Sequence, residues 1–272
     1  MKSPIVTFFL ATLSVTISMP TAAQSRLINH NFQVIERTWN AETQKHDYHY
    51  RTIHGTERSN QALNRLSILS ENQFIYPVPE SGCGPTALLN ILIWYEKFGL
   101  ISPFNRNADS QKYKLNFFNE IDRRISKMAG QQRTESFGTN SLDAAIVMDE
   151  LVHELSQGNL RVHSHIIDPP YELKTFLEML PNFRSGYLIV QPKYPQGMQP
   201  AIGTHAITFI RADRSGYLTF GTWGEVYRGT LKMRDGAQWF IPTDAEQLEL
   251  KILGMVQFIP FEPTTPLDPE PQ

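Results

Sequence analysis

The segment at residues 85–98 carries hydrophobic side chains around nearly its whole helical circumference, instead of on one stripe. A helix with this pattern belongs in the middle of a core. Pro85 suits its first turn, and Gly99 is placed as its C-terminal stop. Periodicity and capping residues predict further helices at residues 60–69, 110–128, 141–156 and 169–180.

Other segments alternate between hydrophobic and polar residues in the manner of β-strands. A hairpin is predicted at residues 31–55, around a polar turn. Because the helices come first and a set of antiparallel strands follows, we expect an α+β protein. These strands are predicted at residues 160–167, 185–194, 204–213, 216–223, 227–233 and 248–261.

The first residues have the layout of a secretory signal peptide. Lys2 supplies a positive charge, residues 5–17 are apolar, and small residues at 21–23 precede a cleavage position near Ala23. A membrane anchor is the weaker interpretation, since the unbroken apolar run is too short to span a bilayer and Pro20 follows it. We therefore expect an exported protein, periplasmic or secreted, without stable membrane insertion.

These patterns divide the chain into consecutive parts. A signal peptide at 1–23 is followed by a hairpin and connector at 24–70, a main domain at 71–261 and a tail at 262–272. The tail is rich in proline and acidic residues, so we expect it to be disordered. The net charge of -2 gives no electrostatic reason to expect a nucleic acid or an anionic membrane as partner.

Cys83 is the one cysteine among the 272 residues, so no internal disulfide is possible. In an exported protein a leftover thiol has three explanations: an intermolecular disulfide, a buried inert side chain, or a reactive group. Free cysteine is among the most buried residue types, which favours the second explanation. The sequence around Cys83 favours the third.

Cys83 stands at the start of the predicted helix, where unpaired backbone amides and the positive end of the helix dipole stabilise a thiolate. Gly82 and Gly84 on either side lack side-chain bulk, so a substrate backbone can approach and the amides stay available to an oxyanion. Acyl-transfer chemistry also needs a proton acceptor, which a histidine elsewhere in the chain has to supply.

His205 has the most suggestive setting among the histidines, because it follows a glycine turn and opens a strongly apolar strand in GTHAITFI. His46 and His49 fall on opposite faces of the predicted hairpin strand, which is poor geometry for joint metal binding. His163 and His165 share a face, but no nearby carboxylate or cysteine completes a site. We therefore expect neither a metal nor a cofactor.

The stretch GCGPTALLNIL, followed far downstream by GTHAITFI, resembles the papain-like cysteine peptidases. It is most similar to the bacterial branch that includes the leader-peptide peptidase domains of bacteriocin exporters and stand-alone exported relatives. The resemblance covers Ser81 to Trp239 and implies a papain-like fold, with a central helix carrying Cys83 packed against a C-terminal antiparallel sheet carrying His205. It also implies that Cys83 is the nucleophile and His205 the general base and acid. The two would form a thiolate-imidazolium pair that attacks a carbonyl of a peptide or protein substrate and gives an acyl-enzyme.

Two positions depart from the family pattern. Relatives carry an asparagine or aspartate that orients the imidazole, and the corresponding residue here is Gly221, which cannot. Thr222 could substitute for it, and Trp223 could still cover the histidine. The family's oxyanion glutamine lies a few residues before the cysteine, whereas Gln73 is farther away. Either the intervening residues loop out and return Gln73 to the site, or backbone amides at the cysteine act alone.

Three interpretations stay open. The first is an exported cysteine hydrolase that cleaves amide bonds of a peptide, a protein or a peptidoglycan stem. The second is a catalytically idle papain-like module that binds a peptide or protein partner, for which Gly221 is the motive. The third is an unrelated exported α+β protein in which Cys83 is a core residue.

Overall fold

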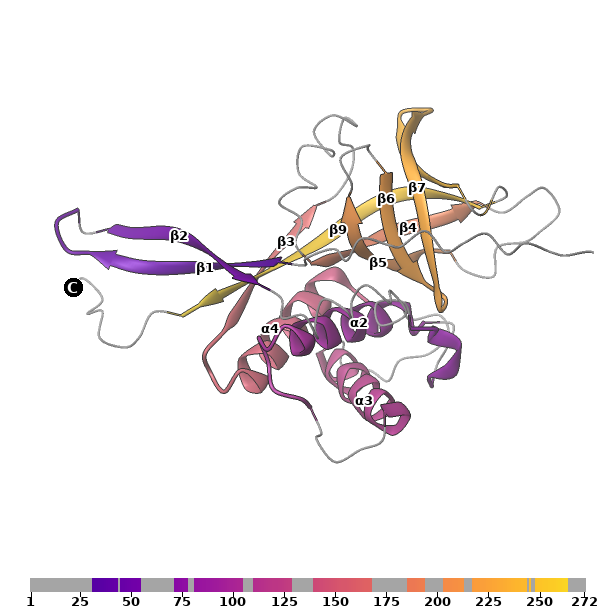
Figure 1. The fold of residues 1–272 in the computed structure, drawn as a ribbon. Helices are drawn as coiled ribbons and strands as arrows, with labels where there is room; N and C mark the ends of the chain where they lie inside the picture. The colour runs from indigo at the N-terminus through magenta and orange to yellow at the C-terminus, as the bar shows by residue number, and fades with distance from the viewer. Residues whose placement is uncertain are drawn as a thin grey trace, which may run out of the picture.

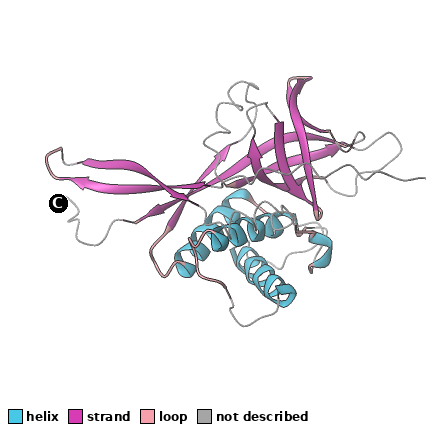
Figure 2. Ribbon diagram, in the orientation of Figure 1, coloured by secondary structure: helices cyan, strands magenta, loops and turns pink. Residues whose placement is uncertain are grey.

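The computed structural model describes residues 31–43, 45–54, 71–77, 81–104, 110–128, 139–167, 185–193, 203–212, 217–243, 245 and 248–263. Helices lie together on one side of a long, twisted sheet (Figures 1 and 2), so the fold is α+β, as the sequence predicts. The helices are η2 (Gln73–Ile75), α2 (Cys83–Lys97), α3 (Ser110–Met128) and α4 (Ser141–Leu155). The strands are β1 (Asn31–Asn40), β2 (Lys45–His54), β3 (Arg161–Ile167), β4 (Gly186–Lys193), β5 (His205–Ala212), β6 (Tyr217–Thr222), β7 (Glu225–Arg234), β8 (Ala237–Pro242) and β9 (Glu249–Glu262).

Within the described residues the strands form one sheet in the order β2-β1-β9-β4-β5-β6-β7-β8, with β3 also paired to β9. The pairing of Trp239 with Lys251 and of Phe240 with Leu250 joins β8 back to β9, which gives a barrel-like closed part. Paired strands are antiparallel except that β1 meets β9 in parallel near Ile35. The hairpin of β1 and β2 extends away from the barrel (Figure 1).

The two long amphipathic helices are confirmed at nearly their predicted bounds, since α3 covers 110–128 and α4 covers 141–155. Asn140 caps α4, because its side-chain oxygen accepts the Leu142 amide at 2.8 Å. The buried helix α2 ends as predicted at a left-handed glycine, Gly99, with φ of 74°. The predicted helices at 60–69 and 169–180, the signal peptide and most of the tail lie outside the described residues.

Strand β8 is not among the strands predicted from the sequence. It follows a two-residue turn at Asp235 and Gly236, whose φ angles are 52° and 70°. An Asp-Gly pair with both residues left-handed is typical of the tightest β-hairpin turn. The Asp-Gly dipeptide between two apolar segments was therefore the signal that could have located this strand.

Two hydrophobic clusters lie on opposite faces of the central strands. The helical cluster combines the buried sides of the helices with Val162, Tyr187, Val256 and Phe258 of the sheet. Along β4, Tyr187 belongs to the helical cluster and Leu188 to the barrel interior, as strand alternation requires. The barrel cluster consists of Leu188, Val190, Ile207, Phe209, Leu218, Phe220, Leu231, Phe240, Leu250, Ile252 and Met255.

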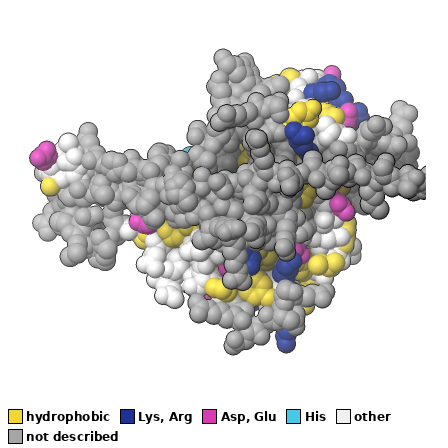
Figure 3. Space-filling model, viewed as in Figure 1, with side chains coloured by type: hydrophobic (Ala, Val, Ile, Leu, Met, Phe, Trp, Pro, Cys, Tyr) yellow, Lys and Arg dark blue, Asp and Glu magenta, His cyan; other side chains and the backbone are white. Residues whose placement is uncertain are grey.

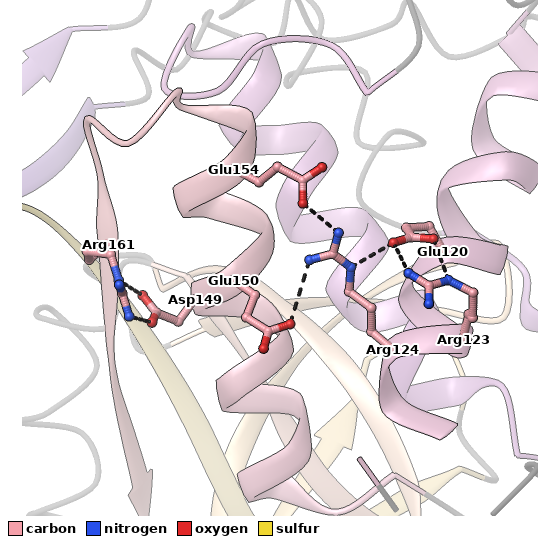
Figure 4. A network of polar contacts seen from close by, with 7 residues as sticks. All are labelled: Glu120, Arg123, Arg124, Asp149, Glu150, Glu154 and Arg161. Carbon is pink, nitrogen blue, oxygen red and sulfur yellow. Dashed lines mark hydrogen bonds and ion pairs between the residues drawn. The ribbon is translucent and has the colours of Figure 1, made fainter. Parts of the chain in front are cut away.

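Charged side chains align the helices with one another and with the sheet edge (Figure 4). Arg124 of α3 reaches Glu154 of α4 with a nitrogen-oxygen distance of 2.6 Å. Arg161 of β3 pairs at two points with Asp149 of α4, whose Oδ1 also accepts the Val162 amide at 2.7 Å. Exposed ion pairs contribute about 0–1 kcal/mol each, so their main effect here is to fix the position of α4 against β3.

The visible surface mixes side-chain types. Basic, acidic and hydrophobic side chains of the described residues all occur on the face seen in Figure 3. This mixture agrees with the small net charge of -2. None of the described helices is long and apolar enough to cross a membrane.

Candidate active site

Cys83 is the first residue of α2. The sequence predicted a helix that begins two residues later, at Pro85. Cys83 forms no disulfide and is partly buried. The N-cap residue is Gly82, which has no side chain to occupy the first amides, and the first backbone bond runs from the Thr86 amide to the Gly82 carbonyl at 2.9 Å. The positive end of the helix therefore lies at the sulfur, where it favours the thiolate.

The start of α4 lies beside the start of α2. A Cβ built on Gly84 would stand 2.3 Å from Thr139 Oγ1, just before the α4 cap. Ser141 hydrogen-bonds Tyr187 of β4, and burial, together with the nearby Cys83 charge, raises the pKa of the Tyr187 phenol. Two helix N-termini are thus close to Cys83, and both favour negative charge there.

Gly84 packs closely against the side chain of Thr139. This packing role of the glycine was not predicted from the sequence. Gly84→Ala is expected to destabilise the protein by about 1–3 kcal/mol, because the new methyl group overlaps the Thr139 side chain. Urea unfolding measures the loss. The double variant Gly84→Ala/Thr139→Gly should recover most of it, and no recovery would mean that Thr139 is not the obstacle.

The imidazole of His205 is held by the turn that follows β6. Its ring stacks on Trp223 with centroids 4.4 Å apart and planes 6° from parallel. Its Nε2 lies 2.5 Å from Thr222 Oγ1. The side chain is 2% exposed, and within the described part of the chain its Nδ1 is buried without a hydrogen-bond partner.

This setting controls the protonation of His205. Burial lowers the pKa of His205 from its ordinary value of 6.5 to about 3. The ring is therefore neutral at physiological pH and can accept a proton. The same burial disfavours the imidazolium, so the ion pair implied by the papain-like resemblance requires a thiolate close by to stabilise it.

The register between α2 and β5 places Cys83 and His205 at the same end of both elements. Asn90 Nδ2 donates to Thr208 Oγ1 at 3.0 Å, and Trp94 packs with Ile210 farther along, so the helix and strand run in parallel. Cys83 precedes Asn90 by nearly two turns, about 10 Å along the same helix face. His205 precedes Thr208 by a similar distance, about 10 Å along the strand.

Strand alternation places the His205 side chain on the barrel side of β5. Ala206 packs with the helical cluster and pairs with Ile189, whereas His205 pairs with Val190 of the barrel cluster. The ring therefore lies at the end of the barrel interior, while α2 packs on the other face of β5. A direct contact between Cys83 Sγ and His205 Nδ1 stays a prediction.

The residue that hydrogen-bonds His205 is not at the position that the family analogy indicated for the orienting residue. Gly221 pairs with Thr208, on the β6 face turned away from His205. Thr222 is the next residue and therefore points to the same side as His205, where it makes the hydrogen bond. The suggestion that Thr222 substitutes and that Trp223 covers the ring agrees with this geometry.

The segment that carries Gln73 lies against the same turn. Gln73 is buried within η2, and a Cβ built on Gly224 would stand 3.2 Å from the Cβ of Asn72. The sequence allowed Gln73 to return to the site by looping out, and the structure brings its segment to the turn that holds His205. A hydrogen bond from the Gln73 side-chain amide to an oxyanion at Cys83 stays a prediction.

A buried polar network that sequence analysis missed fixes this segment. The Glu71 amide donates to Asn90 Oδ1 at 3.2 Å, and Asn90 in turn donates to Thr208. Glu71 also accepts from Tyr76 Oη at 3.1 Å and pairs with Lys114. These contacts join the η2 segment, α2, α3 and β5 around one carboxylate and one amide.

Comparison with protein families, curated proteins and solved structures finds no match to this chain. Among the described residues no group of three or more histidine, cysteine, aspartate or glutamate side chains could hold a metal ion. The geometry of the chain's own residues therefore carries the functional argument.

Proposed function

We propose that this protein is an exported, papain-like cysteine hydrolase that cleaves amide bonds of a peptide, a protein or a peptidoglycan stem. Cys83 is the nucleophile, and His205 is the general base and acid. Thr222 orients the imidazole and Trp223 covers it. The backbone amides of Cys83 and Gly84, with the Gln73 side chain, are the candidate oxyanion donors.

The observation that carries the proposal is the setting of His205. A buried imidazole is hydrogen-bonded at Nε2 to Thr222, stacked on Trp223, and without a described partner at Nδ1. A structural histidine in a core satisfies both nitrogens, because a buried polar atom without a partner costs about 1–3 kcal/mol. A base that takes a proton from Cys83 needs one nitrogen fixed and the other available.

The proposed reaction has two steps, acylation of Cys83 and hydrolysis of the acyl-enzyme. The Cys83 proton passes to His205 Nδ1, and the thiolate sulfur bonds to the carbonyl carbon, which pushes the π electrons onto the oxyanion. The carbon-nitrogen bond then breaks, His205 returns its proton to the leaving amine, and an acyl-enzyme remains. In the second step His205 removes a proton from water, the hydroxide replaces the sulfur, and the thiol is regenerated.

The test is the rate of iodoacetamide alkylation of Cys83 in the full chain between pH 4 and pH 9. Fast labelling is expected to persist well below the ordinary thiol pKa of about 8.5. His205→Ala, or His205→Gln if the alanine variant fails to fold, should slow it at least about tenfold at pH 6, since the base that shares the thiol proton is gone.

Two outcomes of the labelling experiment would count against the hydrolase proposal. Labelling no faster than that of a free thiol would sink the hydrolase proposal. Complete protection from alkylation would favour a core role for Cys83. Circular dichroism of each histidine variant checks that slow labelling does not come from an altered fold.

One observation favours a second function, an idle module that binds a peptide or protein partner. His205 is 2% exposed and lies on the barrel side of β5, where a substrate has little access to it. In that case Cys83→Ala should leave partner binding and the cellular phenotype unchanged. Under the hydrolase proposal the same variant abolishes cleavage.

A further inference from the structure

Two histidines stand side by side on β3, away from the candidate active site. His163 and His165 are both exposed and lie on the face of β3 opposite Val162, which packs into the helical cluster. Their ring centroids are 4.6 Å apart, and their planes are 83° from parallel. Neither side chain takes part in the chemistry proposed above.

A buried amide orients one of these rings. His165 pairs across the sheet with Gln257 of β9, and the two side chains are hydrogen-bonded. Gln257 is 7% exposed, so its amide has few alternative positions. When the amide oxygen accepts one ring N–H, the other ring nitrogen of His165 keeps a lone pair available, as in histidines that bind metals with a second-shell acceptor.

The spacing of the two rings matches adjacent coordination positions. A ring nitrogen about 2.0 Å from a metal puts its ring centroid roughly 3.2 Å from that metal. Two such rings at about 90° have centroids roughly 4.5 Å apart, whereas the tetrahedral angle separates them by roughly 5.2 Å. The observed 4.6 Å fits the first arrangement, which tetragonal ions adopt.

We propose that His163 and His165 form a two-histidine site for a tetragonal divalent cation, with copper(II) bound most tightly, while Gln257 orients His165. Imidazole pairs suit copper(II) and nickel(II), and copper(II) heads the general order of affinity. Water fills the remaining positions, because no third histidine, cysteine or carboxylate joins the pair among the described residues. The site is independent of the proposed hydrolase function.

The experiment is a copper(II) titration of the full chain carrying Cys83→Ser, which prevents the thiol from binding or reducing the ion. Electron paramagnetic resonance should detect one tetragonal copper with two nitrogen ligands. His163→Gln and His165→Gln should each weaken this binding at least about tenfold, because one ligand is lost. Gln257→Leu should weaken it about tenfold through the loss of ring orientation.

His153→Gln is the matched control, because His153 lies on α4 and its Nδ1 contacts the Leu160 carbonyl at 3.3 Å. Its copper affinity should equal that of the parent. Unchanged copper binding in the double variant His163→Gln/His165→Gln would overturn the proposal, since the ion would then be held elsewhere. A tetrahedral ion such as zinc binding more tightly than copper would contradict the geometric argument.

Discussion

Between pH 7 and pH 4 the protein is expected to lose roughly 3 kcal/mol of folding free energy through His205 alone. Burial lowers the pKa of His205 from 6.5 to about 3 in the folded state. In this pH range the unfolded chain binds a proton on His205 and the folded chain does not. Stability therefore falls as the pH drops through the window between about 6.5 and about 3, and it is fully retained above that window.

Urea unfolding at half-unit pH intervals measures this slope. His205→Gln should remove the contribution of this residue, so that its stability curve becomes flatter than the wild-type curve by about 1.4 kcal/mol per pH unit. His153→Gln, which changes an exposed histidine of α4, is the control for replacing a histidine by glutamine elsewhere in the fold. A His205→Gln curve parallel to that of the wild type would contradict the buried, neutral state of the ring.

The lowered pKa of His205 also limits how the proposed hydrolase can work, because it disfavours the imidazolium. A neutral His205 can accept the Cys83 proton, yet the imidazolium that results is stable in this site only beside a negative charge. The two helix N-termini near Cys83 stabilise that negative charge on the sulfur. The reactivity of Cys83 at low pH is thus expected to depend on both the helix starts and His205. This is why alkylation with and without the histidine is more informative than activity alone.

The elements that carry the candidate site could be predicted from local sequence. The start of α2 at Cys83 follows from the glycines, Pro85 and an apolar run that surrounds the helix, and the start of β5 at His205 follows from a glycine turn before an apolar strand. These signals reside in neighbouring residues. The hydrophobic period and the capping residues therefore suffice to place the two candidate side chains, Cys83 at a helix start and His205 at a strand start.

Contacts between distant residues could not be predicted in this way. The bond between Asn90 and Thr208 joins positions 118 residues apart, and the closure of β8 on β9 depends on which strands pair. The family analogy pointed to Gly221, because it counts positions along the chain, whereas the strand period decides that Thr222 faces His205. The face to which a strand side chain points can be assigned only when the strand register is known, and the register is known only from the folded sheet.

Thr222→Val is expected to lower the hydrolytic rate constant of the proposed enzyme by up to about 100-fold, because the imidazole loses the group that fixes its orientation. Valine keeps the shape of threonine but removes Oγ1, which leaves His205 Nε2 buried beside a methyl group. Stability should fall by about 1–3 kcal/mol for the same reason. Turnover of a peptide substrate and urea unfolding measure the two effects separately.

Thr222→Ser is the matched control, because it retains the hydroxyl and should keep most of the rate and stability. A hydroxyl can donate or accept, so Thr222 fixes the plane of the ring without fixing which nitrogen carries the proton. Thr222→Asn, whose carbonyl oxygen can accept from Nε2, is therefore expected to retain more activity than Thr222→Val. If valine were as active as serine, Thr222 would have no orienting role, and the buried ring of His205 would be better explained by packing against Trp223.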